Sequence, residues 1–453
     1  MRTRGLPEVA GVLILVGFWL SSGGLRLLFA LAVVGVLGLF VIMAHPRFIV
    51  DGLAVVLGLV PFGALGPLPL LYVFILGTWV VVAVHPRVER RSRTLNSWVA
   101  GLMFTSLVSV ILVRVGPADY PEFVKWLVAT SVFFPLLMLP TRQILRFGQV
   151  FTIAAAGASI VGSLVATVDK GQVSMKLFNV FGYRGAVVQY VFGSDATETE
   201  RLSGTYLNPN AAGIFLLVAI TLAVALFRGR SRAILVGILA IGLALALSRA
   251  AFGGLAVAAL LIIVFHPADF SRRARTIAAL ASAAVGSLMI PSVAQRLADS
   301  FGSSDAGTQA RGEALSYFPT AMHGHWAFGL GWGRTEFFDA NIAQTVNYVA
   351  NSPLLTIYRG GILTGIAFIG VLVCACIVSG RSVVTRSWTA AIIGASFIGF
   401  TLVTLQLDFP VVTIQPLSAL FSVFLVFVAR SGELGELLDD VRTDTSEELT
   451  HAS

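Results

Sequence analysis

Apolar runs alternate with short polar turns along nearly the whole chain. Most runs approach the 20 or so residues that an α-helix needs to cross a bilayer. They cover approximately residues 7–22, 26–43, 48–64, 67–84, 97–115, 123–139, 149–168, 209–227, 233–247, 250–265, 277–291, 353–379, 388–406 and 413–429. The pattern predicts an all-α, polytopic integral membrane protein with about 12 to 14 transmembrane helices. The lower number applies if 233–247 and 250–265, which meet at Ser248 and Arg249, form one merged or re-entrant segment.

The composition supports this interpretation and excludes a soluble enzyme. Of the 453 residues, 57% are hydrophobic and 12% are charged, whereas soluble proteins carry about 25% charged residues. The net charge of +8 comes from short basic clusters between apolar runs, so we expect the bilayer, and no nucleic acid, to be the partner of these cations. The two cysteines, Cys374 and Cys376, share one apolar run and offer no disulfide framework or thiolate metal site.

The basic clusters also predict the orientation in the membrane. If the N-terminus is cytoplasmic, the cytoplasmic turns collect the arginines of 87–93, 142–146, 228–232, 272–275 and 381–386, as the positive-inside rule requires. We therefore expect a multi-pass protein of the inner or plasma membrane, with both termini cytoplasmic. Residues 1–429 would form the transmembrane bundle, and the acidic residues 430–453 a disordered cytoplasmic tail.

Two connections are much longer than the other turns, and both are predicted on the extracytoplasmic face. They cover residues 169–208 and 292–352. Connections of this length are uncommon unless they form lids, binding loops or small subdomains. The second is rich in aromatic residues, so we expect a folded, helical extracytoplasmic loop with helices near 308–321 and 336–350.

Arginines beside small and polar residues are the main chemical feature of the outer face. Arg201, Arg249 and Arg311 each stand in such a segment. Guanidinium groups make forked contacts to phosphate oxygens, so these arginines would suit a polyprenyl pyrophosphate whose tail stays in the lipid. Snorkelling or helix capping is the alternative role for each of them. Asn210 is predicted to cap the helix that follows it.

Four segments, in this order, resemble the O-antigen ligase/polymerase superfamily. They are RLSGTYLNPNAAG (201–213), LALSRAAFGG (245–254), QARGEALSYFPTAMHGHWAFGLGWG (309–333) and NYVANSPLLTIYRGGILTG (347–365). The resemblance implies a metal-independent, inverting membrane glycosyltransferase without a cofactor. Such enzymes take a glycan from a polyprenyl-pyrophosphate donor on the extracytoplasmic face. They transfer it to a lipid or glycan acceptor, or polymerise it, during the assembly of cell-surface polysaccharide.

Carried over to this sequence, the resemblance assigns donor binding to arginines. Arg201 would contact the pyrophosphate, and Arg249 and Arg311 match later arginines of the family; Asn210 and Asn351 would complete the substrate site. Ligases typically have His-Asn before the last large-loop helix, where the histidine is proposed as the base. This chain has Ala350-Asn351 instead.

The missing histidine leaves the catalytic base open. His323 and His325 are the histidines on the predicted outer face and are candidates for the base, with loop packing as the alternative role for His325. Glu313 and Asp339 are the carboxylate alternatives.

Several functional alternatives remain at this stage. Ligase and polymerase need the same donor site, and the absent histidine favours a polymerase or a divergent ligase. A transporter or lipid-carrier flippase is a competing class, but the spans lack the ladder of acids or histidines typical of proton-driven transport. A non-catalytic scaffold for glycan assembly is a third alternative.

The aromatic residues of the second long connection have two candidate roles, stacking on sugars or anchoring at the membrane interface; they are Trp326, Trp332 and Tyr348. The acidic residues at 195, 198 and 200 are too unspecific in spacing to predict a metal.

Overall fold

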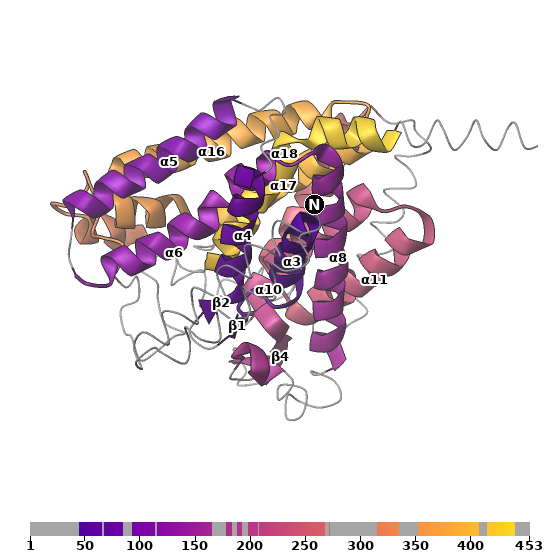
Figure 1. Cartoon of the computed structure of the whole chain (residues 1–453), viewed down its shortest axis with the longest axis horizontal. Coiled ribbons are helices and arrows are strands. Elements are labelled where there is room, and N and C mark those ends of the chain that lie inside the picture. The colour runs from indigo at the N-terminus through magenta and orange to yellow at the C-terminus, as the bar shows by residue number, and fades with distance from the viewer. Residues whose placement is uncertain are drawn as a thin grey trace, which may run out of the picture.

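The structure is a computed structural model of the 453-residue chain, and helices dominate it (Figure 1). It describes residues 45–65, 68–84, 93–113, 116–164, 178–183, 188–192, 198–206, 208–267, 271, 315–334, 352–406 and 415–439; between 188 and 200 it describes the backbone alone. The predicted runs 7–22, 26–43 and 277–291 and the helix expected at 336–350 lie outside these residues.

Each predicted apolar run that reaches into the described residues is helical over most of its described length. The helices are α3 (Pro46–Leu59), α4 (Leu70–Val84), α5 (Arg93–Leu112), α6 (Asp119–Ser131), α7 (Phe133–Leu137), α8 (Thr141–Leu164), α10 (Pro209–Leu226), α11 (Gly229–Ala246), α12 (Arg249–Phe265), α16 (Ser352–Val383), α17 (Trp388–Gln406) and α18 (Gln415–Ala429). Residues 315–321 are also helical, within the helix expected near 308–321. Runs 233–247 and 250–265 are two separate helices, α11 and α12.

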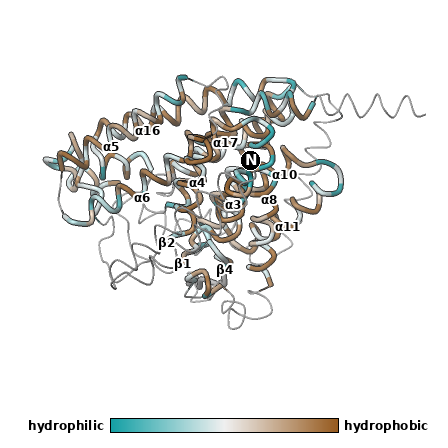
Figure 2. The backbone as a smooth tube through the Cα atoms, in the orientation of Figure 1, coloured by the Kyte–Doolittle hydropathy of each residue, from teal (hydrophilic) through white to brown (hydrophobic). Residues whose placement is uncertain are grey.

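The helices have the length and composition of a multi-pass membrane protein. Within the described residues, six are long and apolar enough to cross a bilayer, or seven if α18 and the helix Ser431–Asp439, bent by 58° against it, count as one span. Two shorter helices, α4 and α12, are also apolar. Figure 2 shows the apolar colour along the helices and polar residues gathered at several turns. The total of about 12 to 14 spans remains a prediction.

The run at 123–139 is broken, which the apolar pattern did not reveal. Helix α6 ends at Ser131 and α7 starts at Phe133, with Val132 between them. Pro135 follows the break. Proline has no N–H to donate to the carbonyl four residues earlier, at Ser131, and its ring crowds that carbonyl. The break therefore falls where proline chemistry requires it.

Helix α10 lies at the centre of one half of the molecule. It packs against α8, α11, α12, α17 and α18, and nearly all of its residues are buried. Its sequence is apolar on every side, which is typical of a helix surrounded by others. The other half is formed by α5, α6 and α16, with α5 and α16 side by side (Figure 1).

Two glycines bring α12 and α17 into close contact. A Cβ atom added at Gly399 would collide with the carbonyl oxygen of Gly254, and one added at Gly254 would lie 3.2 Å from the carbonyl oxygen of Gly399. Small residues of this kind let helix backbones approach each other in membranes.

Gly399→Ala is therefore expected to destabilise the protein by about 1–3 kcal/mol, the usual cost of overpacking a tight core. The matched control is Gly253→Ala, since a Cβ atom at this exposed position of α12 meets no atom within 4 Å. Unfolding midpoints in detergent should fall for Gly399→Ala alone. Equal midpoints for the two variants would contradict the close packing of α12 on α17.

Two short antiparallel hairpins accompany the helices and were not part of the all-α prediction. Strand β1 (Ala64–Leu65) pairs with β2 (Leu68–Pro69), and β3 (Val188–Phe192) pairs with β4 (Glu198–Leu202). The second hairpin lies in the long connection 169–208, and Gln189 faces Arg201 in its register. A one-turn 3-10 helix, η3 (Gly204–Tyr206), then leads to α10.

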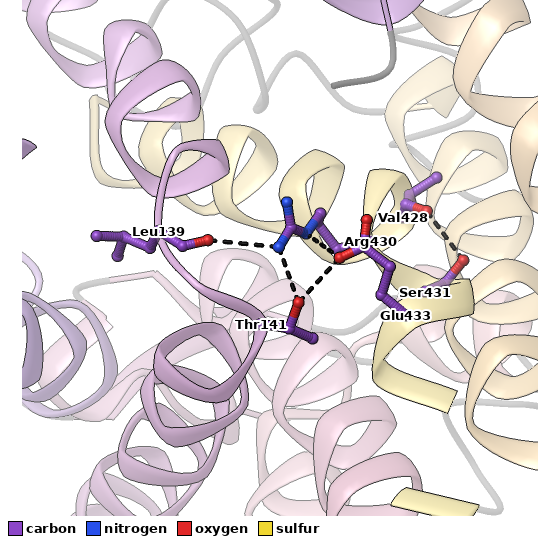
Figure 3. A network of polar contacts seen from close by, with 6 residues as sticks. All are labelled: Leu139, Thr141, Val428, Arg430, Ser431 and Glu433. Carbon is purple, nitrogen blue, oxygen red and sulfur yellow. Dashed lines mark hydrogen bonds and ion pairs between the residues drawn. The ribbon is translucent and has the colours of Figure 1, made fainter. Parts of the chain in front are cut away.

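The prediction of a disordered tail from residue 430 is wrong for its first ten residues. Arg430 is 1% exposed, and its guanidinium donates to the hydroxyl of Thr141 at 2.8 Å and the carbonyl of Leu139 at 3.4 Å (Figure 3). Glu433 pairs with Arg430 at 2.8 Å and accepts a hydrogen bond from Thr141 at 2.9 Å. The helix Ser431–Asp439 follows, with Leu434 fully buried. Residues 440–453 lie outside the described part.

Candidate functional site

Arg201 joins three elements at one point of the fold, which we call the Arg201 junction. The residue is 7% exposed and lies in β4. Its Nε donates to the carbonyl oxygen of Ala246 at 3.1 Å, and Nη2 donates to the side-chain oxygen of Asn210 at 3.0 Å and to the carbonyl oxygen of Leu247 at 3.4 Å. The two carbonyls belong to the C-terminal end of α11. Such carbonyls lack intrahelical partners, and the negative end of the helix dipole favours a cation there.

The turn between α11 and α12 is strained at the Arg201 junction. Leu247 has φ 49° and ψ 38°, and it is the only residue other than glycine with positive φ among those described. L-residues pay about 1–2 kcal/mol for this conformation. Backbone strain of this kind is concentrated at functional sites. Arg249, half-exposed, starts α12 directly after Ser248.

Two buried hydroxyl groups, on residues close in sequence to those of the Arg201 junction, have no hydrogen-bond partner among the described residues. They belong to Thr205 in η3, which is 3% exposed, and to Ser248, which is 1% exposed. The Ser248 side chain lies against Gly213, where an added Cβ atom would collide with it. An unpaired buried hydroxyl costs about 1–3 kcal/mol, so a native structure that keeps one calls for an explanation such as water or a ligand oxygen.

The start of α10 differs from the prediction. Asn208, not Asn210, is the N-cap: its side-chain oxygen accepts from the backbone N–H groups of Asn210 at 2.8 Å and Ala211 at 3.4 Å. The prediction that Asn210 caps the helix is therefore wrong. Pro209 fills the first helical position, which suits proline, and this places the cap one residue before it. The side chain of Asn210 is left to accept from Arg201.

The segment around Tyr206 is held firmly in the protein interior. Its hydroxyl donates to the carbonyl oxygen of Gly58 in α3 at 2.8 Å, and its ring stacks on Phe215 of α10 at 4.7 Å between centroids. Burial raises the pKa of the Tyr206 phenol well above its usual range. The phenol therefore stays protonated and keeps donating, which fixes η3 beside the Arg201 junction.

A second junction is formed by residues 326–333 and the first turns of α16, and we call it the loop–α16 junction. The backbone N–H of Leu330 donates to the carbonyl of Tyr358 at 2.7 Å, and that of Ile362 donates to the carbonyl of Trp326 at 2.9 Å. Helix α16 is interrupted at Gly361, where φ is 80° and ψ is 179°. Because the regular helix is interrupted at Gly361, the N–H of Ile362 bonds the loop instead of a carbonyl of its own helix.

Side chains strengthen the loop–α16 junction. Arg359, 6% exposed, donates from Nη1 to the carbonyl of Trp332 at 3.1 Å. The hydroxyl of Ser109, near the end of α5, donates to the carbonyl of Phe328 at 2.7 Å. The loop is thus attached both to α16 and to α5, and its position is fixed by side chains far apart in the sequence.

Trp332 occupies the interior of the loop–α16 junction. It is 1% exposed, with its ring 4.6 Å from that of Trp126 and 5.2 Å from that of Phe123. Next to it, the buried carboxylate of Asp119 accepts from the N–H of Gly333 at 2.5 Å and from that of Gly116 at 2.8 Å. The prediction that Trp332 stacks on a sugar is therefore wrong, because protein rings cover it. Trp326 is 42% exposed and stays available for either predicted role.

The predicted site residues are only partly brought together. Arg201 and Asn210 are in direct contact, and Arg249 lies two residues after Leu247, which Arg201 also bonds. His323 and His325 are exposed and lie in a different part of the fold, just before the loop–α16 junction. Arg311, Glu313 and Asn351 lie outside the described residues, as do Asp195, Asp339 and Tyr348.

Sequence reasoning missed four residues of these junctions. Arg359 had a visible signal, a cation at the start of an apolar run, but received no role. Asp119 stands in an ordinary polar turn. Thr205 and Ser248 are common residues, and only the three-dimensional structure shows that their hydroxyl groups have no partner among the described residues.

Within the described part of the chain, no group of three or more metal-ligating side chains is present. Comparison with protein-family models and with curated proteins finds no match for this chain.

Proposed function

We propose that this protein is a membrane glycosyltransferase of the O-antigen ligase/polymerase type, acting on a polyprenyl-pyrophosphate-linked glycan at the extracytoplasmic face. The observation that carries the proposal is the Arg201 junction. Residues 201 and 210 of one motif meet residues 246 and 247 of the other around a buried guanidinium. Two motifs this far apart in the sequence can share one catalytic site only if folding brings them together. Here Arg201 of the first motif bonds the carbonyls of Ala246 and Leu247 in the second.

The chemistry of the Arg201 junction suits a diphosphate leaving group. Arg201 and Arg249 supply positive charge, the hydroxyls of Thr205 and Ser248 are available donors, and α10 begins beside them. Phosphate oxygens are favoured by such donors and by helix N-termini. As the bond between the sugar anomeric carbon and the phosphate oxygen breaks, charge grows on the diphosphate, and these groups would stabilise it.

The transfer itself needs a base. The acceptor hydroxyl attacks the anomeric carbon from the face opposite the diphosphate, its proton passes to the base, and polyprenyl pyrophosphate leaves. We keep His323 and His325 as the proposed candidates for the base; both are exposed, but they lie in a different part of the fold from the Arg201 junction, so the role requires that one of them meet the acceptor hydroxyl in the donor complex. Glu313 is the carboxylate alternative. Water exclusion and acceptor binding would fall to the loop 292–352.

The orientation in the membrane belongs to the same proposal. Helix α8 begins at Thr141 with Arg142 and Arg146 in its first turns, and ends near Gly162, beside Gly204 of η3. Because cations mark the cytoplasmic side, the start of α8 would face the cytoplasm and the Arg201 junction the outside. The protein would then reside in an inner or plasma membrane with its site on the far side.

The function is tested in proteoliposomes with a polyprenyl pyrophosphate that carries a fluorescent oligosaccharide. The wild-type protein should lengthen or transfer the glycan and release the carrier pyrophosphate, and His323→Ala/His325→Ala together should lower the rate by about 100-fold or more, as loss of a general base does. Tyr317→Phe, on the same segment, is the control and should keep the wild-type rate. Flux of lipid-linked glycan or ions without any transfer would instead support the transporter or flippase reading.

A further inference from the structure

We infer that a pocket at the opposite end of α8 from the Arg201 junction binds the phosphate headgroup of an anionic phospholipid. The cavity has a volume of about 220 Å³ and is formed where α3, α4 and the connection between α7 and α8 meet. Its polar lining consists of Arg47 and Gln143, and its apolar lining of Val81, Val82, Met138 and Leu139. This site does not depend on the proposed glycosyltransferase function.

The charge at this pocket is positive. Arg47 is exposed, and no acidic residue of the described part of the chain lines the cavity. The nearest acid along α3, Asp51, is already neutralised: Arg146 donates from Nε to its Oδ1 at 3.1 Å and from Nη2 to its Oδ2 at 2.6 Å. A guanidinium without a competing carboxylate in the same cavity is suited to a phosphate oxygen, and the amide of Gln143 adds a neutral donor.

Helix ends of both polarities border the pocket. Pro46 and Pro140 line it and stand at the starts of α3 and α8, whereas Val81 and Val82 lie in the last turn of α4, which ends at Val84. The positive and negative ends of the helix dipoles therefore offset each other, and the preference for an anion rests on Arg47 and Gln143.

The pocket combines charge with an apolar wall beside the start of α8, an end that would lie at the boundary of the membrane if α8 crosses the bilayer. The four apolar side chains offer a surface for glycerol and the first acyl carbons, which an inorganic anion would not use. Next to Arg47, Phe48 is 63% exposed, and aromatic residues at this level are typical of the lipid headgroup region. A cavity of about 220 Å³ has the size of a small-molecule group such as a headgroup.

The test compares Arg47→Gln with Arg142→Gln in the full-length protein. Both variants remove one exposed cation at the same end of the molecule, but Arg142 does not line the pocket. The protein is purified in detergent, and unfolding midpoints are measured during titration with phosphatidylglycerol, phosphatidylcholine or soluble glycerol phosphate.

We expect phosphatidylglycerol to raise the midpoint of the wild-type protein and of Arg142→Gln, with phosphatidylcholine having little effect. Arg47→Gln should need at least about tenfold more phosphatidylglycerol, which corresponds to about 1.4 kcal/mol. An equal loss in Arg142→Gln would overturn the site in favour of general surface charge. An equal effect of glycerol phosphate would overturn the lipid as its ligand. No response of the wild-type protein to phosphatidylglycerol would overturn the proposal as a whole.

Discussion

Replacing Arg201 with lysine is expected to reduce glycan transfer by about 100-fold or more, because displacement of a positioning group by about 1 Å already costs that much. Lysine keeps the charge but has no planar fork, so it cannot reach the carbonyls of Ala246 and Leu247 and the side chain of Asn210 together. Carrier release from a fluorescent lipid-linked donor measures the effect, expressed per folded molecule.

Loss of stability must be separated from loss of donor binding in this experiment. Arg430→Lys is the matched control, since Arg430 is also buried and also donates to a backbone carbonyl. It contacts Thr141 at the start of α8, whereas η3 lies beside Gly162, about 30 Å further along the helix at 1.5 Å per residue.

Both arginine variants should lower the unfolding midpoint, because each leaves buried carbonyls without a donor at about 1–3 kcal/mol apiece. Only Arg201→Lys should lower the turnover of the molecules that remain folded. If the two variants have the same turnover per folded molecule, the role of Arg201 is structural and the proposed donor site is wrong.

Gly361→Ala is expected to be the most destabilising glycine-to-alanine substitution in the described part of α16. Glycine holds φ at 80° there, and a Cβ atom would collide with the carbonyl oxygen of Ala327 and lie 2.6 Å from the Cα atom of Phe328. The conformation alone costs an alanine about 1–2 kcal/mol, and the clash with backbone atoms should bring the total to about 3 kcal/mol or more.

The same substitution at Gly380 is the control for helix propensity. A Cβ atom at Gly380 meets no atom within 4 Å, so Gly380→Ala should be neutral or stabilising by up to about 1 kcal/mol. The two unfolding midpoints, measured in one detergent, give the comparison. A Gly361→Ala protein as stable as Gly380→Ala would mean that residues 326–333 do not pack against the interruption in α16.

Element boundaries show where the sequence was informative and where it was not. The run 209–227 predicted α10 almost to the residue, because an uninterrupted apolar stretch flanked by turn residues leaves little freedom. The run 123–139 was equally apolar, yet Pro135 divides it. At the C-terminus, Leu434 and Leu438 recur at helical spacing among acids, and burial of Arg430 decides that this segment folds onto the bundle.

The candidate site was predictable only in part, because side chains can be recognised in a sequence but their backbone partners cannot. Arg201 was found because it stands beside small and polar residues on the predicted outer face, where a guanidinium suits phosphate oxygens. Its partners at Ala246 and Leu247 are backbone carbonyls, which carry no sequence signal at all. The exchange of roles between Asn208 and Asn210 depends on one residue of helix register, which composition does not specify.

The amino-acid sequence by itself determined that this chain forms long apolar helices, because a backbone in lipid must satisfy its own hydrogen bonds and helices do so within one segment. Only the tertiary structure decided which helix ends meet, that the loop 326–333 packs into the interruption at Gly361, and that Arg201 is buried against the end of α11. These contacts join backbone atoms from distant segments, and their geometry depends on how the helices pack against one another.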